Sequence, residues 1–344
     1  MFSKFINFIS QPNIAIDLGT ANTRVYNSNL EKVIEEPSTL HLVSHNSTTK
    51  NLDKYTEFNN RNIVASPLRG GVIIDIRKAI TLLKPLVKKT RRFLIPPISL
   101  ACAPTDTSDM ERHFLTDAIT LAGASHVSII PEVWAAAIGA GIDVTNPYAQ
   151  VIIDIGDGVT DMAVIRDGRI VYTSAVRTAC SDLQKAIRSA IMSKHKIQLY
   201  AHDVVQLTHE ISSMSNHQEP HRKFVNVRGI DILRRSEVSI NVNSDDIVFA
   251  MTPVINKILR MIEVGLQKVP ESIFCEILES GICLTGGGAC IKGIDRLIAF
   301  RTKLNVRIAP DPIHSVINGA IQTLNYWKDD KNWWKKISWP KLAS

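Results

Sequence analysis

The chain has 344 residues, which at the usual ~100–200 residues per domain predicts about two domains. Its 45% hydrophobic and 21% charged content is that of a globular protein and excludes wholesale disorder. No apolar run reaches about 18 residues, which excludes a membrane-spanning helix. The net charge of +7 favours a polyanionic partner, with nucleic acid, an anionic lipid surface and bound nucleotide all open. The five cysteines show no metal-ligand spacing, and we interpret them as reduced core residues of a cytosolic protein.

The first ten residues have the pattern of an amphipathic helix. Phe2, Phe5, Ile6 and Ile9 fall on one face and leave polar residues for the other. Such a short helix is marginal in water, so we expect it to form on a surface. The segment lacks the long apolar region and the cleavage site of a secretory signal. The pattern favours membrane binding, and docking on the protein core is the alternative.

The first strand-like run covers residues 14–16 and ends in Asp17-Leu18-Gly19-Thr20, and a second run follows at residues 24–26. A glycine turn after a strand lets a polyphosphate approach backbone N–H groups that a Cβ would obstruct. A carboxylate at the strand end can hold a hydrated Mg²⁺, which takes few protein ligands. Asp17 is therefore a candidate metal ligand beside a candidate phosphate loop.

A basic segment with apolar residues lies between residues 84 and 97. Lys88 and Lys89 precede Phe93-Leu94-Ile95, which prolines follow directly. A basic residue near an anionic leaflet contributes about 1 kcal/mol. We interpret Phe93, Leu94 and Ile95 as a loop that inserts into a membrane, and the alternative is that these side chains pack against the core.

The second half of the chain repeats the pattern of the first. The run 151–153 ends in Asp154-Ile155-Gly156-Asp157-Gly158, a hairpin-like run follows at 162–165, and a third run, 281–284, ends in Thr285-Gly286-Gly287-Gly288. Two Asp-x-Gly loops in a duplicated setting predict a nucleotide held between two domains, with Asp154 as the second candidate metal ligand. Strands alternating with helices predict α/β architecture. The helical patterns cover residues 109–123, 132–141, 182–194, 246–269 and 313–327.

The last residues of the chain combine tryptophan with lysine. Trp333, Trp334 and Trp339 lie among Lys335, Lys336 and other lysines. Tryptophan and lysine together are typical of the bilayer interface. Stacking on nucleic acid and docking on a partner protein are the alternatives.

From residue 12 to residue 325, in order and at matching spacing, the chain resembles the MreB family, the bacterial actins that organise rod shape. The resemblance implies the α/β actin-like fold, shared with hexokinase and the heat-shock-chaperone ATPases, in which two duplicated domains surround a nucleotide cleft. The motifs that carry the resemblance are residues 17–23, 71–75, 102–104, 111–112, 135–141, 154–156, 163–165, 209–211, 227–229, 284–289 and 311–312.

The resemblance also implies a domain division. Residues 1–11 would be a membrane-binding segment. Residues 12–32, 66–145 and 318–344 would form the core of domain I, with residues 33–65 as its small subdomain. Residues 146–181 and 243–317 would form the core of domain II, with residues 182–242 as its small subdomain.

By resemblance, the expected cofactors are ATP and Mg²⁺, the latter held through Asp17 and Asp154. Glu132 matches the family's catalytic glutamate, which orients or deprotonates the attacking water, and Thr160 is a second expected catalytic residue. The residues expected to bind the nucleotide are Asp17, Gly19, Thr20, Ala21, Asn22, Asp154, Gly156, Asp157, Gly158, Gly286, Gly287 and Gly288.

The chain departs from the family in the second glycine loop and at the residues that contact the ribose in the family. Asp157 and Val159 replace a glycine and a threonine, and the charge of Asp157 repels phosphates unless Mg²⁺ or a basic group is close. Residues 179–181 replace Gly-Gly-Asp, and residues 205–208 replace a Glu-x-x-Lys that contacts the ribose. These departures predict a primarily structural protein that is at most a weak or slow ATPase.

The function implied by the resemblance is a membrane-associated, nucleotide-dependent filament of identical subunits. It would lie in the cytoplasm on the inner face of the cell membrane and organise cell-wall synthesis and cell shape. Its partners would be elongation proteins of the MreC, MreD and RodZ type, and not nucleic acid. A nucleotide-independent filament scaffold and a sugar-kinase-like ATPase of the same fold are the alternatives.

Overall fold

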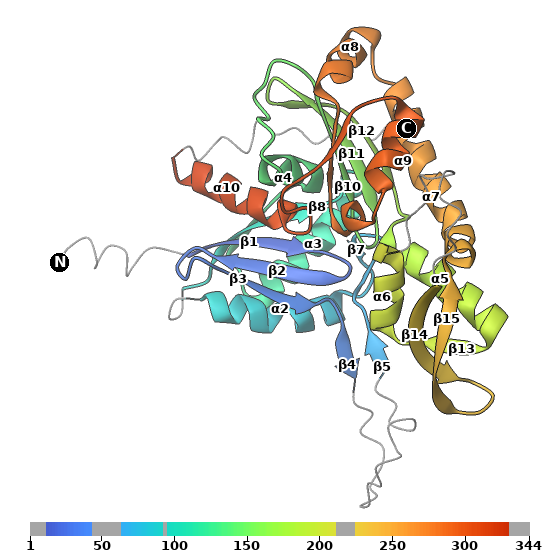
Figure 1. The fold of residues 1–344 in the computed structure, drawn as a ribbon. Helices are drawn as coiled ribbons and strands as arrows, with labels where there is room; N and C mark the ends of the chain where they lie inside the picture. The colour runs from blue at the N-terminus through green and yellow to red at the C-terminus, as the bar shows by residue number, and fades with distance from the viewer. Residues whose placement is uncertain (1–11, 43–62, 92–94, 211–223, 330–344) are drawn as a thin grey trace, which may run out of the picture.

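Two five-stranded sheets with the same strand order form the centre of the protein (Figure 1). The structure, a computed structural model, describes residues 12–42, 63–91, 95–210 and 224–329. The strand order is β3-β2-β1-β8-β9 in the first sheet and β12-β11-β10-β16-β17 in the second. In both sheets the first strand in the chain pairs antiparallel with the next strand and parallel with a later one. This repeated topology confirms the predicted duplicated α/β fold.

The strand-like runs of the sequence lie at the centres of these sheets. The first sheet comprises β1 (Asn13–Leu18), β2 (Asn22–Asn27), β3 (Lys32–Pro37), β8 (Ile98–Ala103) and β9 (His126–Pro131). The second comprises β10 (Gln150–Ile155), β11 (Thr160–Arg166), β12 (Arg169–Val176), β16 (Ile282–Thr285) and β17 (Val306–Ile308). Three small sheets pair β4 (Leu40–Leu42) with β5 (Ile63–Ala65), β6 (Leu68–Arg69) with β7 (Val72–Ile73), and β14 (Phe224–Asp231) with β13 (Ile197–Leu199) and β15 (Ser236–Asn243).

Helices cover both faces of each sheet. Between the two sheets lie α4 (Glu132–Gly139) and α10 (Ser315–Asp329), which share one buried cluster with side chains of both sheets. The other face of the first sheet packs on α2 (Ile76–Thr90) and α3 (Asp109–Ala122). The other face of the second packs on α5 (Cys180–His195), α7 (Ser244–Gln267) and α9 (Ile294–Thr302), with α6 (Ala201–Glu210) and α8 (Glu271–Ser280) beside them.

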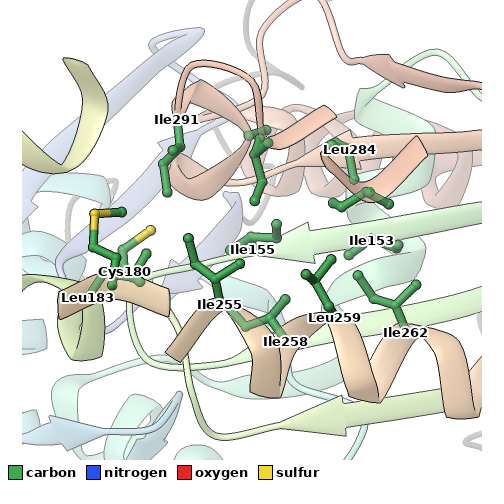
Figure 2. Close-up of a cluster of buried hydrophobic side chains, with 14 of the residues drawn as sticks. Ile153, Ile155, Cys180, Leu183, Ile255, Ile258, Leu259, Ile262, Leu284 and Ile291 are labelled. Atoms are coloured by element: carbon green, nitrogen blue, oxygen red, sulfur yellow. The ribbon is translucent and has the colours of Figure 1, made fainter. Parts of the chain in front are cut away.

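The alternating side chains of β10 explain why Asp154 faces the other half of the molecule. Ile153 and Ile155 point toward Ile258 and Leu259 of α7, as Figure 2 shows. Successive side chains of a strand point to opposite faces, so Ile152 and Asp154 face the layer between the sheets, and Ile152 lies in the cluster around α4 and α10. The strand sequence thus buries one face and directs Asp154 toward the other half of the molecule.

The helices α4 and α10 cross in backbone contact. A Cβ added to Gly139 would come within 1.8 Å of the Ser315 carbonyl oxygen, and one added to Gly319 within 1.7 Å of the Ala135 carbonyl oxygen. No larger residue fits at either position without moving a helix. The crossing therefore fixes α4, and with it Glu132 at the start of that helix.

The structure corrects two details of the prediction. Residues 33–37 belong to β3 of the large sheet, because they pair with β2 along its length, so the small subdomain of domain I cannot begin at residue 33. Cys275 is exposed on α8 and is not a core residue, whereas Cys102, Cys180 and Cys283 are buried. The other domain boundaries remain a prediction.

Part of the predicted membrane surface lies outside the described residues. This holds for Phe2, Phe5, Ile6 and Ile9, for Phe93 and Leu94, and for the tail after residue 329. Ile95 is described and is half-buried. Within the ranges given above, no helix has the length and apolarity needed to cross a bilayer.

Candidate nucleotide-binding site

A cavity of about 330 Å³ lies between the two sheets, where the ends of β1, β10 and β16 meet. Strands of both halves deliver their loops to it, because β1 and β10 hold equivalent places in the two sheets. Of the predicted site residues, the cavity is lined by Asp17, Gly19, Thr20, Ala21, Asn22, Glu132, Asp154, Gly156, Asp157, Gly158, Gly286 and Gly287. The structure does not place Thr160 and Gly288 in the wall.

Two hydroxyl groups hold the first loop in place, that of Ser38 outside the loop and that of Thr20 within it. Ser38 Oγ donates to the Gly19 carbonyl oxygen at 2.6 Å. The Gly71 N–H donates to Thr20 Oγ1 at 3.1 Å and ties the loop to the turn between β6 and β7. A Cβ at Gly19 would come within 2.8 Å of the Asn22 carbonyl oxygen. The loop therefore needs glycine for its own tight turn.

The second loop abuts the first. It closes with a hydrogen bond from the Gly156 N–H to the Val159 carbonyl oxygen, at 3.0 Å. A Cβ on Gly158 would come within 2.4 Å of Thr20 Oγ1 and within 3.0 Å of the Gly70 and Gly71 nitrogens. Glycine at 158 thus allows the loops of the two halves to touch.

The triple glycine has three separate roles. Gly286 adopts a left-handed φ of 79°, and its N–H donates to the Pro312 carbonyl oxygen at 2.8 Å. Gly287 faces the cavity, and a Cβ there would meet nothing within 4 Å. Gly288 is buried, and a Cβ would come within 2.2 Å of Ile155 Cγ2. Glycine is therefore required at this position by the packing behind the cavity wall.

Three buried carboxyl groups, those of Asp17, Asp154 and Asp161, and the half-buried Glu132 lie in or near the cavity. Burial raises the pKa of Asp17, although Arg24 opposes this, and it raises the pKa of Asp154 to about 6. Burial and then the charges of Asp154, Asp17 and Asp161 raise the pKa of Glu132 well above its usual range. Burial also raises the pKa of Asp161 to about 7. Burial is the largest cause of each shift, so these carboxyl groups hold their protons more tightly than exposed acids, and a cation in the cavity would favour their ionised forms.

Arg24 supplies one positive charge to this acidic wall. The strand register places it opposite Asp17 on β1 and opposite Glu35 on β3. Its Nη1 donates to Asp17 Oδ2 at 3.1 Å, and its Nη2 donates to Glu35 Oε1 at 2.9 Å. Burial acts to lower the pKa of Arg24, but the two carboxylates outweigh it and the pKa is raised. The guanidinium is therefore a permanent cation in the wall.

Asp157 and Thr160 have surroundings that the sequence did not predict. Burial raises the pKa of Asp157, and the charge of Lys185 on α5 opposes this, so a basic group is indeed close. Thr160 is fully buried, and its Oγ1 donates to the Thr178 carbonyl oxygen at 2.8 Å. Its hydroxyl is therefore occupied behind the loop and does not face the cavity.

On the side of α5 and α6, the wall of the cavity combines apolar and polar side chains. It includes Cys180 and Gln184 of α5, Val205 and His209 of α6, and Ile313 before α10. Thr208 takes the place of the family's lysine, but its Oγ1 donates to the carbonyl oxygen of Val204 within α6 at 2.8 Å. The replaced ribose-contacting pair thus leaves Val205 in the wall and Thr208 buried.

Two polar contacts join the halves beside the cavity. Arg177, after β12, donates from Nε to Asp106 Oδ2 at 2.9 Å and from Nη1 and Nη2 to the Glu111 carboxylate at 3.0 and 3.2 Å. Asp161 on β11 accepts from the Thr105 N–H at 2.7 Å and from Thr105 Oγ1 at 2.5 Å. The first contact is half-exposed and the second is buried.

The residues fit a nucleotide with a hydrated metal ion better than a protein-caged metal ion. No group of three or more histidine, cysteine, aspartate or glutamate side chains in the described ranges is arranged to hold a metal. Asp17 and Asp154 alone can supply the one or two carboxylates that Mg²⁺ takes beside phosphates and waters. Gly287, where an added Cβ would meet nothing within 4 Å, leaves the backbone open to a phosphate chain on the cavity side.

Sequence reasoning missed several wall residues. Arg24 gave a signal, since a charged residue within a strand directly after a phosphate loop is unusual, and hairpin pairing brings it opposite Asp17. Gly71 was noted only as a family motif. His209, like Gly71, was part of a family motif only, whereas Gln184 and Ile313 gave no signal, because separate elements bring them to the cavity.

A family model described as MreB/Mbl protein matches residues 11–332. The cell shape-determining protein Mbl of Bacillus subtilis (strain 168) is 29% identical over 318 residues, which cover 90% of this chain and 94% of the relative. The cell shape-determining protein MreB of Escherichia coli (strain K12) is 30% identical over 340 residues, which cover 94% and 96%.

Solved structures agree with the fold. MreB5 of Spiroplasma citri bound to AMPPNP superposes with a TM-score of 0.82 at 28% identity and covers 94% of this chain and 98% of that chain. The same protein bound to ADP gives a TM-score of 0.81. A double helical filament of MamK gives a TM-score of 0.73 at 18% identity and covers 92% and 99%, a likeness of fold alone.

Proposed function

This chain belongs to the MreB/Mbl family, and from that premise we propose that it is an actin-like cytoskeletal protein whose identical subunits assemble into filaments that determine cell shape. We further propose that a nucleotide, ATP or ADP with Mg²⁺, occupies the cavity between its two sheets. Curated relatives carry the description of cell shape-determining proteins. A neighbour at 28% identity has been crystallised with AMPPNP and with ADP.

The observation that carries the nucleotide proposal is the convergence of three glycine loops on one cavity. Gly158 and Thr20 bring the loops of the two halves into contact, and Gly286 closes the third side. The first loop and the second loop would hold the phosphates through backbone N–H groups. Asp17 and Asp154 would hold the Mg²⁺, which when bound supplies the charge that offsets the phosphates.

Glu132 is the residue best placed to act in hydrolysis. It begins α4 at the wall of the cavity, so its carboxylate could orient or deprotonate a water. The neighbouring carboxylates and burial raise its pKa, and a general base must be ionised. Activity would therefore depend on a cation in the site. Since the Thr160 hydroxyl is bonded to Thr178, we expect hydrolysis to be slow.

We also propose that the filament lies on the cytoplasmic face of the cell membrane and works with elongation proteins of the MreC, MreD and RodZ type. Support comes from the sequence pattern of residues 1–11 and from the basic end of α2, where Lys88 and Lys89 occupy the last turn. Ile95 follows that helix and is only half-buried. Basic and apolar residues together suit an anionic bilayer.

Sedimentation of the full chain tests these proposals. The chain is spun with and without ATP and Mg²⁺, and with and without anionic liposomes, while phosphate release is measured. We expect a polymer that depends on nucleotide, binds the liposomes and releases phosphate slowly. A polymer that is indifferent to ATP and releases no phosphate would favour the nucleotide-independent scaffold. Absence of any polymer would contradict the filament proposal.

A further inference from the structure

We propose that Arg24 is a phosphate-binding residue, whose guanidinium donates hydrogen bonds to the phosphate oxygens of a nucleoside diphosphate or triphosphate in the cavity. The inference rests on the proposed function, namely that a nucleotide occupies this cavity. It adds to that function a residue that binds the phosphates, and an expectation about how far nucleotide binding depends on Mg²⁺.

The strand register brings Arg24 to the phosphate end. Arg24 lies opposite Asp17 in the β1–β2 hairpin, and Asp17 directly precedes the first glycine loop. Arg24, Asp17 and Gly19 all line the cavity. The side chain of Arg24 is 9% exposed, so the guanidinium is held in place and is not a mobile surface charge.

The charges of the wall make Arg24 the local partner for an anion. Among the described residues of the wall, Arg24 is the one arginine or lysine, whereas Asp17, Glu132, Asp154 and Asp157 are acidic. A nucleotide brings several further negative charges into this low-dielectric space. Repulsion between these groups is strong there, so a fixed cation at the phosphate end has a large effect on affinity.

Arg24 also has hydrogen-bond donors to spare. A guanidinium carries five N–H groups in a planar fork. In the structure Nη1 donates to Asp17 and Nη2 donates to Glu35, whereas the buried Nε has no acceptor. A buried donor without an acceptor is unfavourable. A small rotation of the guanidinium toward the cavity would give its unused donors a phosphate oxygen.

The Arg24–Asp17 pair leads to a specific expectation about the metal. Without nucleotide, Arg24 is the counter-ion of Asp17. Once Arg24 donates to a phosphate, the Asp17 carboxylate becomes free to take a hydrated Mg²⁺. Part of the charge on the phosphates is then offset by the protein itself, so diphosphate binding should persist to a measurable degree without Mg²⁺.

A purely structural salt bridge across β1, β2 and β3 is the alternative role for Arg24. The structure already gives Glu35 a second neighbour, because His314 Nε2 lies 3.5 Å from Glu35 Oε2. Loss of Arg24 would therefore leave Glu35 a partner. The two roles differ in what they predict for metal dependence, since a structural bridge has no reason to affect binding more in the absence of Mg²⁺.

The test measures ADP affinity of the full chain in excess Mg²⁺ and in excess EDTA. The variants are Arg24→Gln, which removes the charge, and Arg24→Lys, which keeps it. Arg166→Gln is the matched control, because Arg166 ends β11, the strand equivalent to β2, and pairs with Glu276 at 3.0 Å. Circular dichroism checks the fold of each variant.

We expect Arg24→Gln to lose about ten- to hundredfold in ADP affinity in EDTA, as for a hydrogen bond to a charged group. The loss should be smaller in Mg²⁺, and Arg24→Lys and Arg166→Gln should retain most of the affinity. An equal loss in both buffers, or none, overturns the proposal. So does a wild-type chain that binds ADP in Mg²⁺ and not at all in EDTA, a result that needs no variant. If the wild-type chain binds ADP in neither buffer, the proposed function is overturned instead.

Discussion

Replacing Asp161 with asparagine should make the folded chain increasingly more stable than wild type as the pH rises. Asp161 is 1% exposed, and burial raises its pKa to about 7 from an ordinary value of 3.8. An acid whose pKa is raised on folding loses its proton first in the unfolded chain. The wild type therefore loses stability as the pH rises from the unfolded pKa to the folded pKa, and an asparagine does not titrate.

The size of the effect follows from the shift in pKa. About three pKa units at ~1.4 kcal/mol per unit give a difference of about 4 kcal/mol once the pH exceeds the folded pKa. Between about pH 5 and about pH 8 the difference should grow by about 2–3 kcal/mol. Asparagine can keep both contacts with Thr105, because its Oδ1 can accept from the N–H and its Nδ2 can donate to Oγ1. At about pH 5 Asp161→Asn should already be more stable by about 1–2 kcal/mol, and the two proteins should become similar only below the unfolded pKa of 3.8.

The measurement is urea unfolding across this pH range, followed by far-ultraviolet circular dichroism. Asp167→Asn is the control, since Asp167 is exposed in the turn after β11 and asparagine tolerates its left-handed φ of 49°. A difference that stays constant, or that shrinks as the pH rises, would refute the reasoning. It would mean that the bonds from Thr105 stabilise the carboxylate more than burial disfavours it.

Three further predictions concern the cavity and the helices beside it. Gly158→Ala should weaken ADP binding about tenfold or more, because overpacking costs ~1–3 kcal/mol and its Cβ would come within 2.4 Å of Thr20 Oγ1; wild-type affinity in a competition assay would contradict the contact between the two loops. Adding Mg²⁺ should raise ADP affinity by a larger factor as the pH rises through about 6, the pKa of Asp154, since a metal ligand must be ionised. If titrations of Asp154→Asn show the same increase with pH, the increase is due to another group. Gly319→Ala should lower the free energy of unfolding by about 2 kcal/mol or more, because its Cβ would overlap a carbonyl oxygen of α4, and an unchanged urea midpoint would contradict the close crossing.

The sequence predicted those elements whose pattern is local and strong. Residues 14–16 and 151–153 lie in β1 and β10, and the helical pattern at 246–269 lies in α7 (Ser244–Gln267). The helix α2 was missed because Pro85 and a run of lysines interrupt it, and its basic end drew the interpretation toward a surface cluster. A proline inside a helix costs stability, which in α2 is offset by the burial of Leu82, Leu83 and Leu86.

Site residues followed the same rule. Asp17 and Asp154 could be predicted because each ends an apolar run directly before a glycine, and both line the cavity. Thr160 could not be judged, because only the fold reveals that the Thr178 carbonyl takes its hydroxyl. Arg177 lies 66 residues from Glu111 in sequence, and its pairing across the halves leaves no local pattern.

The two kinds of contact between the halves have a mechanical consequence. The buried layer around α4 and α10 joins the two sheets through apolar side chains, so dissolved ions hardly affect it. The pairing of Arg177 with Asp106 and Glu111 is half-exposed, so salt screens it. Added salt should therefore weaken the Arg177 contacts at the edge of the cleft and leave the apolar contacts around α4 and α10 unchanged. The ionic strength of the cell would then set how easily the two halves move relative to each other.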